Sequence, residues 1–207
     1  MARQNSKRKS TQELSSIPYK FAEIRYLPTE VIIIPSVSSE KREYIPIGFL
    51  NSNSIVVAPN FAVYNAQPWI FAVITSRMHM VWVRAVGGRL KTDYRYSAKL
   101  CYNTFPFPDI NVKQKENLNL YVFAILEERE KHPEKTMAWL YNPDTMPTGL
   151  RKAHKELDEA VEKCYRLQPF TTDTERLEYL FRLYEEMTQK DTLFAKQKSK
   201  RNPKSKK

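Results

Sequence analysis

Residues 75–102 read TSRMHMVWVRAVGGRLKTDYRYSAKLCY, and they connect a helical pattern to an extended one. One acid, Asp93, stands among six basic groups, which are Arg77, Arg84, Arg89, Lys91, Arg95 and Lys99. Guanidinium and amine donors beside a lone carboxylate and aromatic rings suit the reading of base edges in a DNA groove. A solvated basic surface would have the same composition, and charge alone favours neither interpretation.

The first half of this segment continues a helical pattern that begins at Pro68, a residue suited to the first turn of a helix. Apolar residues follow mostly three or four apart, and the glycines at 87 and 88 end the run. The spacing predicts one helix on which Arg77 and Arg84, seven residues apart, share a face. His79 lies inside that helix, where a hydrogen-bonded core histidine is favoured over a metal ligand.

The second half predicts an extended segment over residues 91–96, whose side chains alternate between two faces. Tyr94 and Tyr96 then pack on the domain, and the opposite face carries Lys91, Asp93 and Arg95. A lysine donates to guanine O6 and N7, and an aspartate accepts from cytosine N4. Lys91 and Asp93 could therefore read both bases of one G·C pair, with Arg95 reading or positioning a neighbouring pair. The alternative is an ion pair between Asp93 and Lys91 or Arg95 on a wet strand.

The other cations of the segment are predicted to contact phosphates, which position a protein on DNA without specifying sequence. These are Arg77, Arg84, Arg89 and Lys99. The amide-rich loop over residues 51–60 could reach further bases, although solvated turns have the same composition.

Upstream, residues 17–66 are rich in β-branched and aromatic residues, which predicts strands at 21–26, 31–34, 44–50 and 55–58. Downstream, two prolines within residues 104–110 predict a hinge between domains. Helices are predicted beyond it, at 118–131, 150–165 and 172–189, and the last begins with a capping-box pattern. Residues 142–144 predict a turn before the second of these helices.

The predicted fold class is therefore α+β. A mixed β-rich recognition domain over 17–112 precedes a small helical domain over 113–190, and basic disordered tails occupy 1–16 and 191–207. The net charge of +11 arises entirely within residues 1–10 and 196–207, which contain basic groups and no acid. Such tails bind phosphate without sequence preference or only keep a protein soluble.

Independent catalysis is not expected. The chain has only four glycines and no glycine-rich phosphate or dinucleotide loop. Its three histidines lie apart without metal spacing, and Cys101 and Cys164 fit a reducing cytoplasm and no zinc site. No apolar run approaches the roughly 20 residues of a membrane helix, so we expect a cytoplasmic protein without membrane contact.

Five segments resemble the C-terminal part of the MmeI-like (type IIL) restriction–modification enzymes. They occur in the family's order at residues 38–50, 75–80, 84–97, 102–106 and 140–147. The resemblance covers roughly residues 20–190, and the longest segment, RAVGGRLKTDYRYS, is specific. Members of this family join an endonuclease, an N6-adenine methyltransferase that uses S-adenosylmethionine, and a target recognition domain in one polypeptide.

The resemblance implies a sequence-specific double-stranded DNA recognition module without catalytic residues, in which Lys91 and Asp93 match specificity positions. It implies that S-adenosylmethionine and Mg²⁺ belong only to the missing domains. Three alternatives stay open: a specificity subunit acting with a separate methyltransferase partner, a non-specific basic RNA-binding protein, and a folded remnant without activity.

Overall fold

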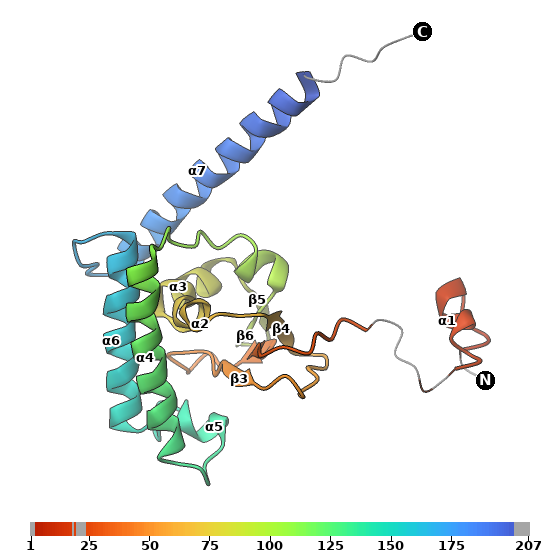
Figure 1. Cartoon of the computed structure of the whole chain (residues 1–207), viewed down its shortest axis with the longest axis horizontal. Coiled ribbons are helices and arrows are strands. Elements are labelled where there is room, and N and C mark those ends of the chain that lie inside the picture. The colour runs from red at the N-terminus through yellow and green to blue at the C-terminus, as the bar shows by residue number, and fades with distance from the viewer. Residues whose placement is uncertain (1–2, 18, 20–23, 201–207) are drawn as a thin grey trace.

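The computed structural model describes residues 3–17, 19 and 24–200, with side chains as far as residue 189. Two small sheets lie beside α2 and α3 in the middle of the molecule, α4 and α6 run together along one side, and α7 extends away from the body (Figure 1). The predicted α+β class is confirmed.

The first sheet is built on β1, Val31–Ile34, the buried β-branched strand that the sequence predicts. It pairs antiparallel with β3, Gly48–Leu50, and with β4, Phe61–Tyr64. The predicted strand at 44–50 is thus wrong in its first half, where Tyr44, Ile45 and Ile47 enter the core from an irregular segment around Pro46.

The predicted strand at 55–58 is also wrong. Ile55 and Val57 are 63% and 55% exposed, and the pairing strand comes later at β4. β-Branched residues favour a strand only where a pleated surface is available to pack them. Of the predicted strand at 21–26, residues 21–23 lie outside the described residues and 24–26 form no strand.

The second sheet has β6, Asp93–Arg95, in its centre, between β2, Val37–Ser38, and β5, Gly88–Leu90. All its pairings are antiparallel. A π-helix, η1, Ala98–Tyr102, follows it.

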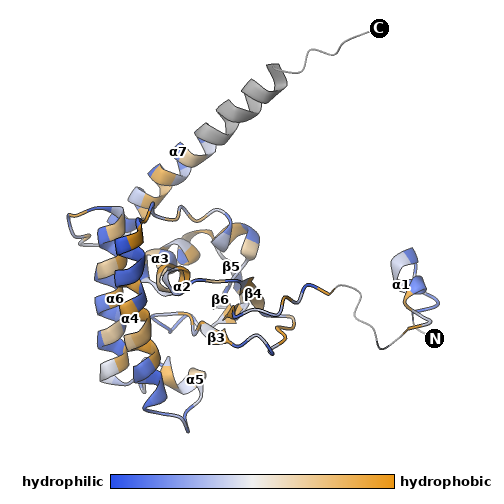
Figure 2. Ribbon diagram, viewed as in Figure 1, coloured by the Kyte–Doolittle hydropathy of each residue, from blue (hydrophilic) through white to orange (hydrophobic). Residues whose placement is uncertain are grey.

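The helix predicted from Pro68 to Gly87 is two helices, α2, Pro68–Thr75, and α3, Arg77–Val86. The backbone of Ser76 is extended, with ψ of 163°, and its hydroxyl accepts a hydrogen bond from the His79 amide. Ser76 therefore caps α3 at the point where continuous apolar spacing predicted one uninterrupted helix. Both helices are rich in apolar residues, as Figure 2 shows, because they occupy the centre of the core.

The C-terminal helices are α4, Val112–Glu130, the short α5, Met137–Leu140, α6, Thr148–Tyr165, and α7, Asp173–Lys200. They confirm the three predicted helices, with α4 and α7 longer than expected. The Asn111–Gln114 capping box starts α4, and the Thr172 hydroxyl accepts the Glu175 amide at the start of α7. The predicted turn at 142–144 precedes α6, where the Asn142 side chain accepts the Asp144 amide.

Residues 104–110 do not separate two cores. Phe105 and Ile110 are buried, and one hydrophobic cluster extends from Ile32 in β1 to Leu180 in α7. Two prolines exclude regular structure from this segment, but its aromatic and aliphatic side chains still fill the space between the two halves.

The terminal segments contain helix where the sequence predicts disorder. The helix α1, Lys9–Glu13, lies within 1–16, and α7 continues to residue 200, while 201–207 lie outside the described residues. Nowhere in the described part of the chain does a helix have the length and apolar character needed to span a membrane.

Candidate nucleic-acid interface

Residues 88–95 form a β-hairpin, which we call the reading hairpin. Leu90 pairs with Asp93, so the turn consists of Lys91 and Thr92. Lys91 has a φ of 57° and is not extended, contrary to the prediction of one strand over 91–96. A two-residue hairpin turn demands positive φ because its twist must match that of the strands. The Arg89 guanidinium donates to the carbonyl of Thr92 over 3.2 Å and holds the turn closed.

The two faces of the hairpin differ as predicted. Tyr94 and Tyr96 are buried against the domain, whereas Arg95 is exposed and Asp93 is half-buried. Arg89 lies opposite Tyr94 in the register, and its guanidinium stacks 4.1 Å from the centre of that ring. Residues directly opposite share a face. Arg89 therefore covers the tyrosine face and is separated from Asp93 and Arg95.

Asp93 has a backbone partner and, among the described residues, no cationic one. Its carboxylate accepts the Glu40 amide over 3.3 Å. Within the described residues it forms no ion pair with Lys91 or Arg95, the pairing that the alternative interpretation expects. The Glu40 contact brings a loop with the exposed Lys41 beside the hairpin. The sequence predicts no role for this loop, although residues 38–43, SSEKRE, form a run of charged residues.

Arg77 and Arg84 are on one face of α3, as their spacing predicts, but that face meets α7. The Asp173 carboxylate accepts Arg77 Nε over 2.7 Å and an Arg84 terminal nitrogen over 3.4 Å. Arg77 and Arg84 are thus already paired with a carboxylate, whereas Lys99, on η1, is exposed and has no ion pair among the described residues. The predicted phosphate contacts consequently fall into paired and unpaired groups.

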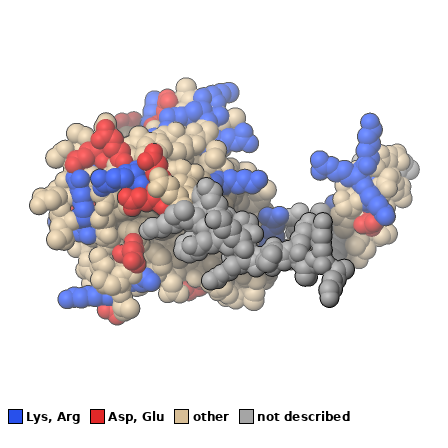
Figure 3. Space-filling model, turned by 90° about the horizontal axis from the view of Figure 1, so that it is seen from above, with Lys and Arg blue, Asp and Glu red and all other residues tan. Residues whose placement is uncertain are grey.

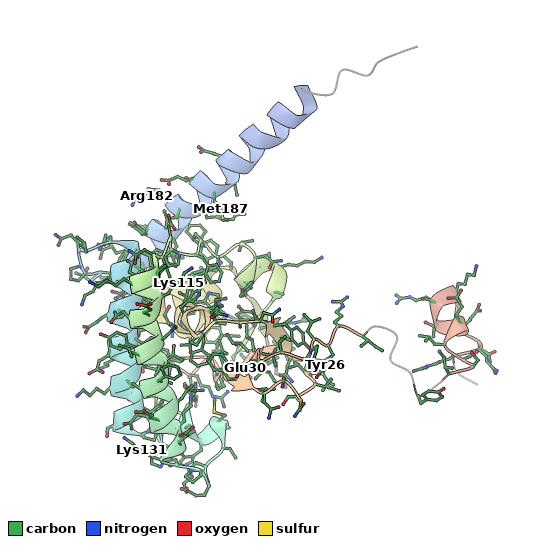
Figure 4. All side chains as sticks on the ribbon, viewed as in Figure 1. Tyr26, Glu30, Lys115, Lys131, Arg182 and Met187 are labelled. Carbon is green, nitrogen blue, oxygen red and sulfur yellow. The ribbon has the colours of Figure 1, made fainter. Side chains whose placement is uncertain are left out.

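Some of the polar groups of the amide-rich loop at 51–60 are hydrogen-bonded within the loop. The Asn51 side chain accepts from the Asn53 amide and the Ser54 hydroxyl. Tyr26, labelled in Figure 4, donates its hydroxyl to the carbonyl of Ser52. The Asn51 oxygen is therefore engaged within its own turn.

Beneath the hairpin lies His79, fully buried, with Nε2 2.9 Å from the Tyr96 hydroxyl. Burial lowers the pKa of His79 to about 3, so the ring stays neutral at physiological pH. Its other nitrogen has no partner among the described residues. The histidine supports the tyrosine face of the hairpin from the core, as the sequence pattern favours.

A buried carboxylate in α6, Asp158, joins the two halves of the molecule. It accepts the Arg77 amide and the Tyr44 hydroxyl, each over 2.7 Å. Burial raises the pKa of Asp158 to about 7, although both of these hydrogen bonds oppose the shift. The Tyr44 ring stacks on His154 with 4.2 Å between ring centres. Sequence reasoning missed this network because nothing local links residues 114 positions apart.

Charge on the folded body is mixed. On the face drawn in Figure 3, acidic side chains gather toward the left, the side on which α4 and α6 lie in Figure 1, and basic ones occur on both sides. Within the part of the chain that the structure describes, no three His, Cys, Asp or Glu side chains are grouped to hold a metal ion. The arrangement offers hydrogen-bond donors and one acceptor at a hairpin tip.

Two family models together match most of the chain. The family model described as MmeI, target recognition domain, matches residues 1–109, and that described as MmeI, C-terminal domain, matches residues 110–192. The chain is 46% identical over 188 residues to DNA methyltransferase A of Bacillus subtilis (strain 168), which covers 91% of this chain and 21% of that protein.

One solved structure matches closely. It contains the Type IIL restriction-modification enzyme MmeI in complex with DNA, with a TM-score of 0.85 and 43% identity, and the match covers 90% of this chain and 25% of that one. This chain therefore spans about a fifth to a quarter of the length of these relatives.

Proposed function

The chain belongs to the MmeI family, and from that premise we propose that it is a module that reads sequence in double-stranded DNA. One observation carries the proposal: the reading hairpin presents Lys91, Asp93 and Arg95 without ionic partners among the described residues, on a base of buried tyrosines. The likeness to an enzyme solved in complex with DNA supports it.

Base reading would take place in the major groove, which is wide enough for a two-stranded β-ribbon. Lys91 at the turn donates to a guanine, and Asp93 accepts from the paired cytosine. The Glu40 amide binds one carboxylate oxygen of Asp93, and the other has no hydrogen-bond partner among the described residues. Arg95, on the face of Asp93, reads or positions the adjacent base pair.

Phosphate contacts fall to the exposed cations around the hairpin. Lys99 follows the hairpin on η1 and Arg89 belongs to it; both residues are exposed and have no ion pair in the described part of the chain, although the Arg89 guanidinium also stacks on Tyr94. Phosphate contacts fix orientation and make affinity depend on salt, while base contacts specify the sequence.

The methylation and cleavage reactions of the family would require the polypeptide that the relatives have beyond the matched span. We propose that this chain itself binds neither S-adenosylmethionine nor Mg²⁺. Its four glycines form no phosphate-binding loop, and its described acidic side chains are not grouped for a metal. A methyltransferase domain or subunit is the expected partner besides DNA.

Selection of randomised duplex DNA by the full 207-residue chain at moderate salt tests the proposal. We expect an enriched motif with a fixed G·C pair. The exchange variant, Lys91→Glu with Asp93→Arg, should change the preference at that one position and leave the rest of the motif. Enrichment of no motif by the wild-type chain, or an unchanged motif in the exchange variant, would contradict the proposal.

A further inference from the structure

The reading hairpin is attached to the body through α3. Only Gly87 separates the end of α3 from β5. A β-carbon at Gly87 would lie 2.5 Å from the carbonyl oxygen of Val83, so only glycine allows the chain to leave the helix this tightly. Any rotation or shift of α3 is therefore transmitted to the hairpin with little slack.

One carboxylate of α7 contacts both ends of α3. Asp173, in the first turn of α7, contacts Arg77 near the start of α3, Arg84 near its end, and Arg176 on α7 itself, over 2.7, 3.4 and 3.5 Å. Arg77 and Arg84 are one heptad apart, so two contacts to one point fix both the position of the helix and its rotation about its axis.

Contacts with α7 and α6 also hold α3 in place. Trp82 on α3 packs against Phe181 and Tyr184 on α7, with ring centres 5.2 and 5.7 Å apart. The Arg77 amide donates to the buried Asp158 of α6. The loop beside Asp93 is held too, because Arg151 of α6 pairs with Glu43 over 2.8 Å.

We propose that Asp173 is a positioning residue for DNA reading, which holds α3 through Arg77 and Arg84 so that the hairpin meets the groove in one orientation. This inference rests on the proposed function. It assigns Arg77 and Arg84 to positioning the hairpin, in place of the phosphate contacts that the sequence suggests. It also makes the C-terminal helices a part of the reading module and not only a neighbour of it.

The variant Asp173→Asn separates a positioning role of Arg77 and Arg84 from a phosphate-contact role, because the two roles predict different changes in DNA binding. If Arg77 and Arg84 position the hairpin, the variant loses discrimination between the selected motif and a duplex with the G·C pair replaced, by roughly 3- to 30-fold. If they contact phosphate, the loss of a competing carboxylate tightens binding to every duplex and steepens the salt dependence.

A second variant covers the case in which Asp173→Asn does not fold. Arg84→Gln should lower discrimination and leave the salt slope unchanged. Uniform weakening with a slope reduced by about one would identify a phosphate contact and overturn the proposal. The matched control is Glu156→Gln, which removes one charge from the exposed Lys152–Glu156 pair of α6, outside these contacts, and should change neither quantity.

Hydrogen exchange of the 207-residue chain without DNA tests the positioning role without relying on the proposed function. Asp173→Asn should speed amide exchange in residues 88–95 while the amides of β1 keep their protection. If the wild type enriches no DNA motif, the proposed function fails, and the exchange rates still decide whether Asp173 holds the hairpin. Unchanged exchange in residues 88–95 would overturn the positioning role.

Discussion

The reading hairpin and the junction of α3, α6 and α7 both contain arginines, but their arginines have different surroundings. At the junction Arg77, Arg84 and Arg176 each pair with an acid, and Arg176 with Glu162 forms a buried ion pair of 2.7 Å. At the hairpin Lys91 and Arg95 are exposed and form no ion pair with any described residue. A run of basic residues that looks uniform in the sequence is thus divided by the fold into structural and available charges.

The largest expected effect lies at the junction. Replacing Arg176 by Met leaves the Glu162 carboxylate buried without its partner, and we expect a loss of about 3–5 kcal/mol in the free energy of unfolding. Urea denaturation measures it. The double variant Arg176→Met with Glu162→Leu should recover most of the loss, since two apolar side chains then replace both charges. A loss below about 1 kcal/mol for the single variant is the size expected for an exposed ion pair and would contradict this prediction.

The next effect concerns the pH dependence of the junction. Because the folded pKa of Asp158 is about 7 against an ordinary value of 3.8, its stabilising contribution is complete below pH 3.8 and is lost as the pH rises toward 7. At about 1.4 kcal/mol for each pKa unit, the whole shift corresponds to a loss of roughly 4 kcal/mol. Tyr44, Arg77 and Glu162 face this carboxylate.

Two buried histidines work in the opposite direction. The pKa values of His79 and His154 are lowered by burial, so their contribution to stability falls as the pH drops below about 6.5. The difference between wild type and Asp158→Asn isolates the carboxylate. Both proteins contain the two histidines and share their effect. Urea denaturation at pH 5 and pH 8 should therefore show that the unfolding free energy of the wild type falls relative to that of the variant as the pH rises. Equal pH profiles would contradict the role of Asp158.

At the hairpin, stability and recognition should separate. Lys91 has a positive φ, which glycine adopts without strain, so Lys91→Gly should leave the unfolding free energy unchanged or raise it by about 0.5–1 kcal/mol. The same variant removes the proposed donor to guanine and should lower discrimination at one base pair by about 10- to 100-fold. Thermal denaturation and competition between two duplexes measure the two quantities. If Lys91→Gly loses stability but still discriminates between the two duplexes, both expectations are contradicted.

The smallest effect is expected for an exposed cation without a partner. Lys99→Ala should change the unfolding free energy by no more than about 0.5 kcal/mol. It should weaken binding to all duplexes alike and reduce the slope of log affinity against log salt by about one. Binding at three salt concentrations tests this, with Lys152→Ala, an exposed cation of α6, as the control. A loss confined to one sequence would indicate base contact instead.

Local patterns predicted the elements that depend on local interactions. The β-branched run at Val31–Ile34 became the central strand, and the apolar stripes and caps placed α6 and the start of α7 within two residues. The alternation at the hairpin correctly placed Tyr94 and Tyr96 inward. The misses have the same origin: Ser76 interrupts a helix whose apolar spacing continues through it, and the strand expected at 55–58 found no partner.

The sequence by itself determined the family, the α+β class and the stretch from which DNA reading is proposed, because these depend on contiguous residues and on their spacing. Only the tertiary structure decided which charges of that stretch remain available. Arg77 and Asp173 are 96 positions apart and Tyr44 and Asp158 are 114 apart. Ion pairs and buried hydrogen bonds join such residues only when packing of the core brings their helices together, and no local pattern encodes that meeting.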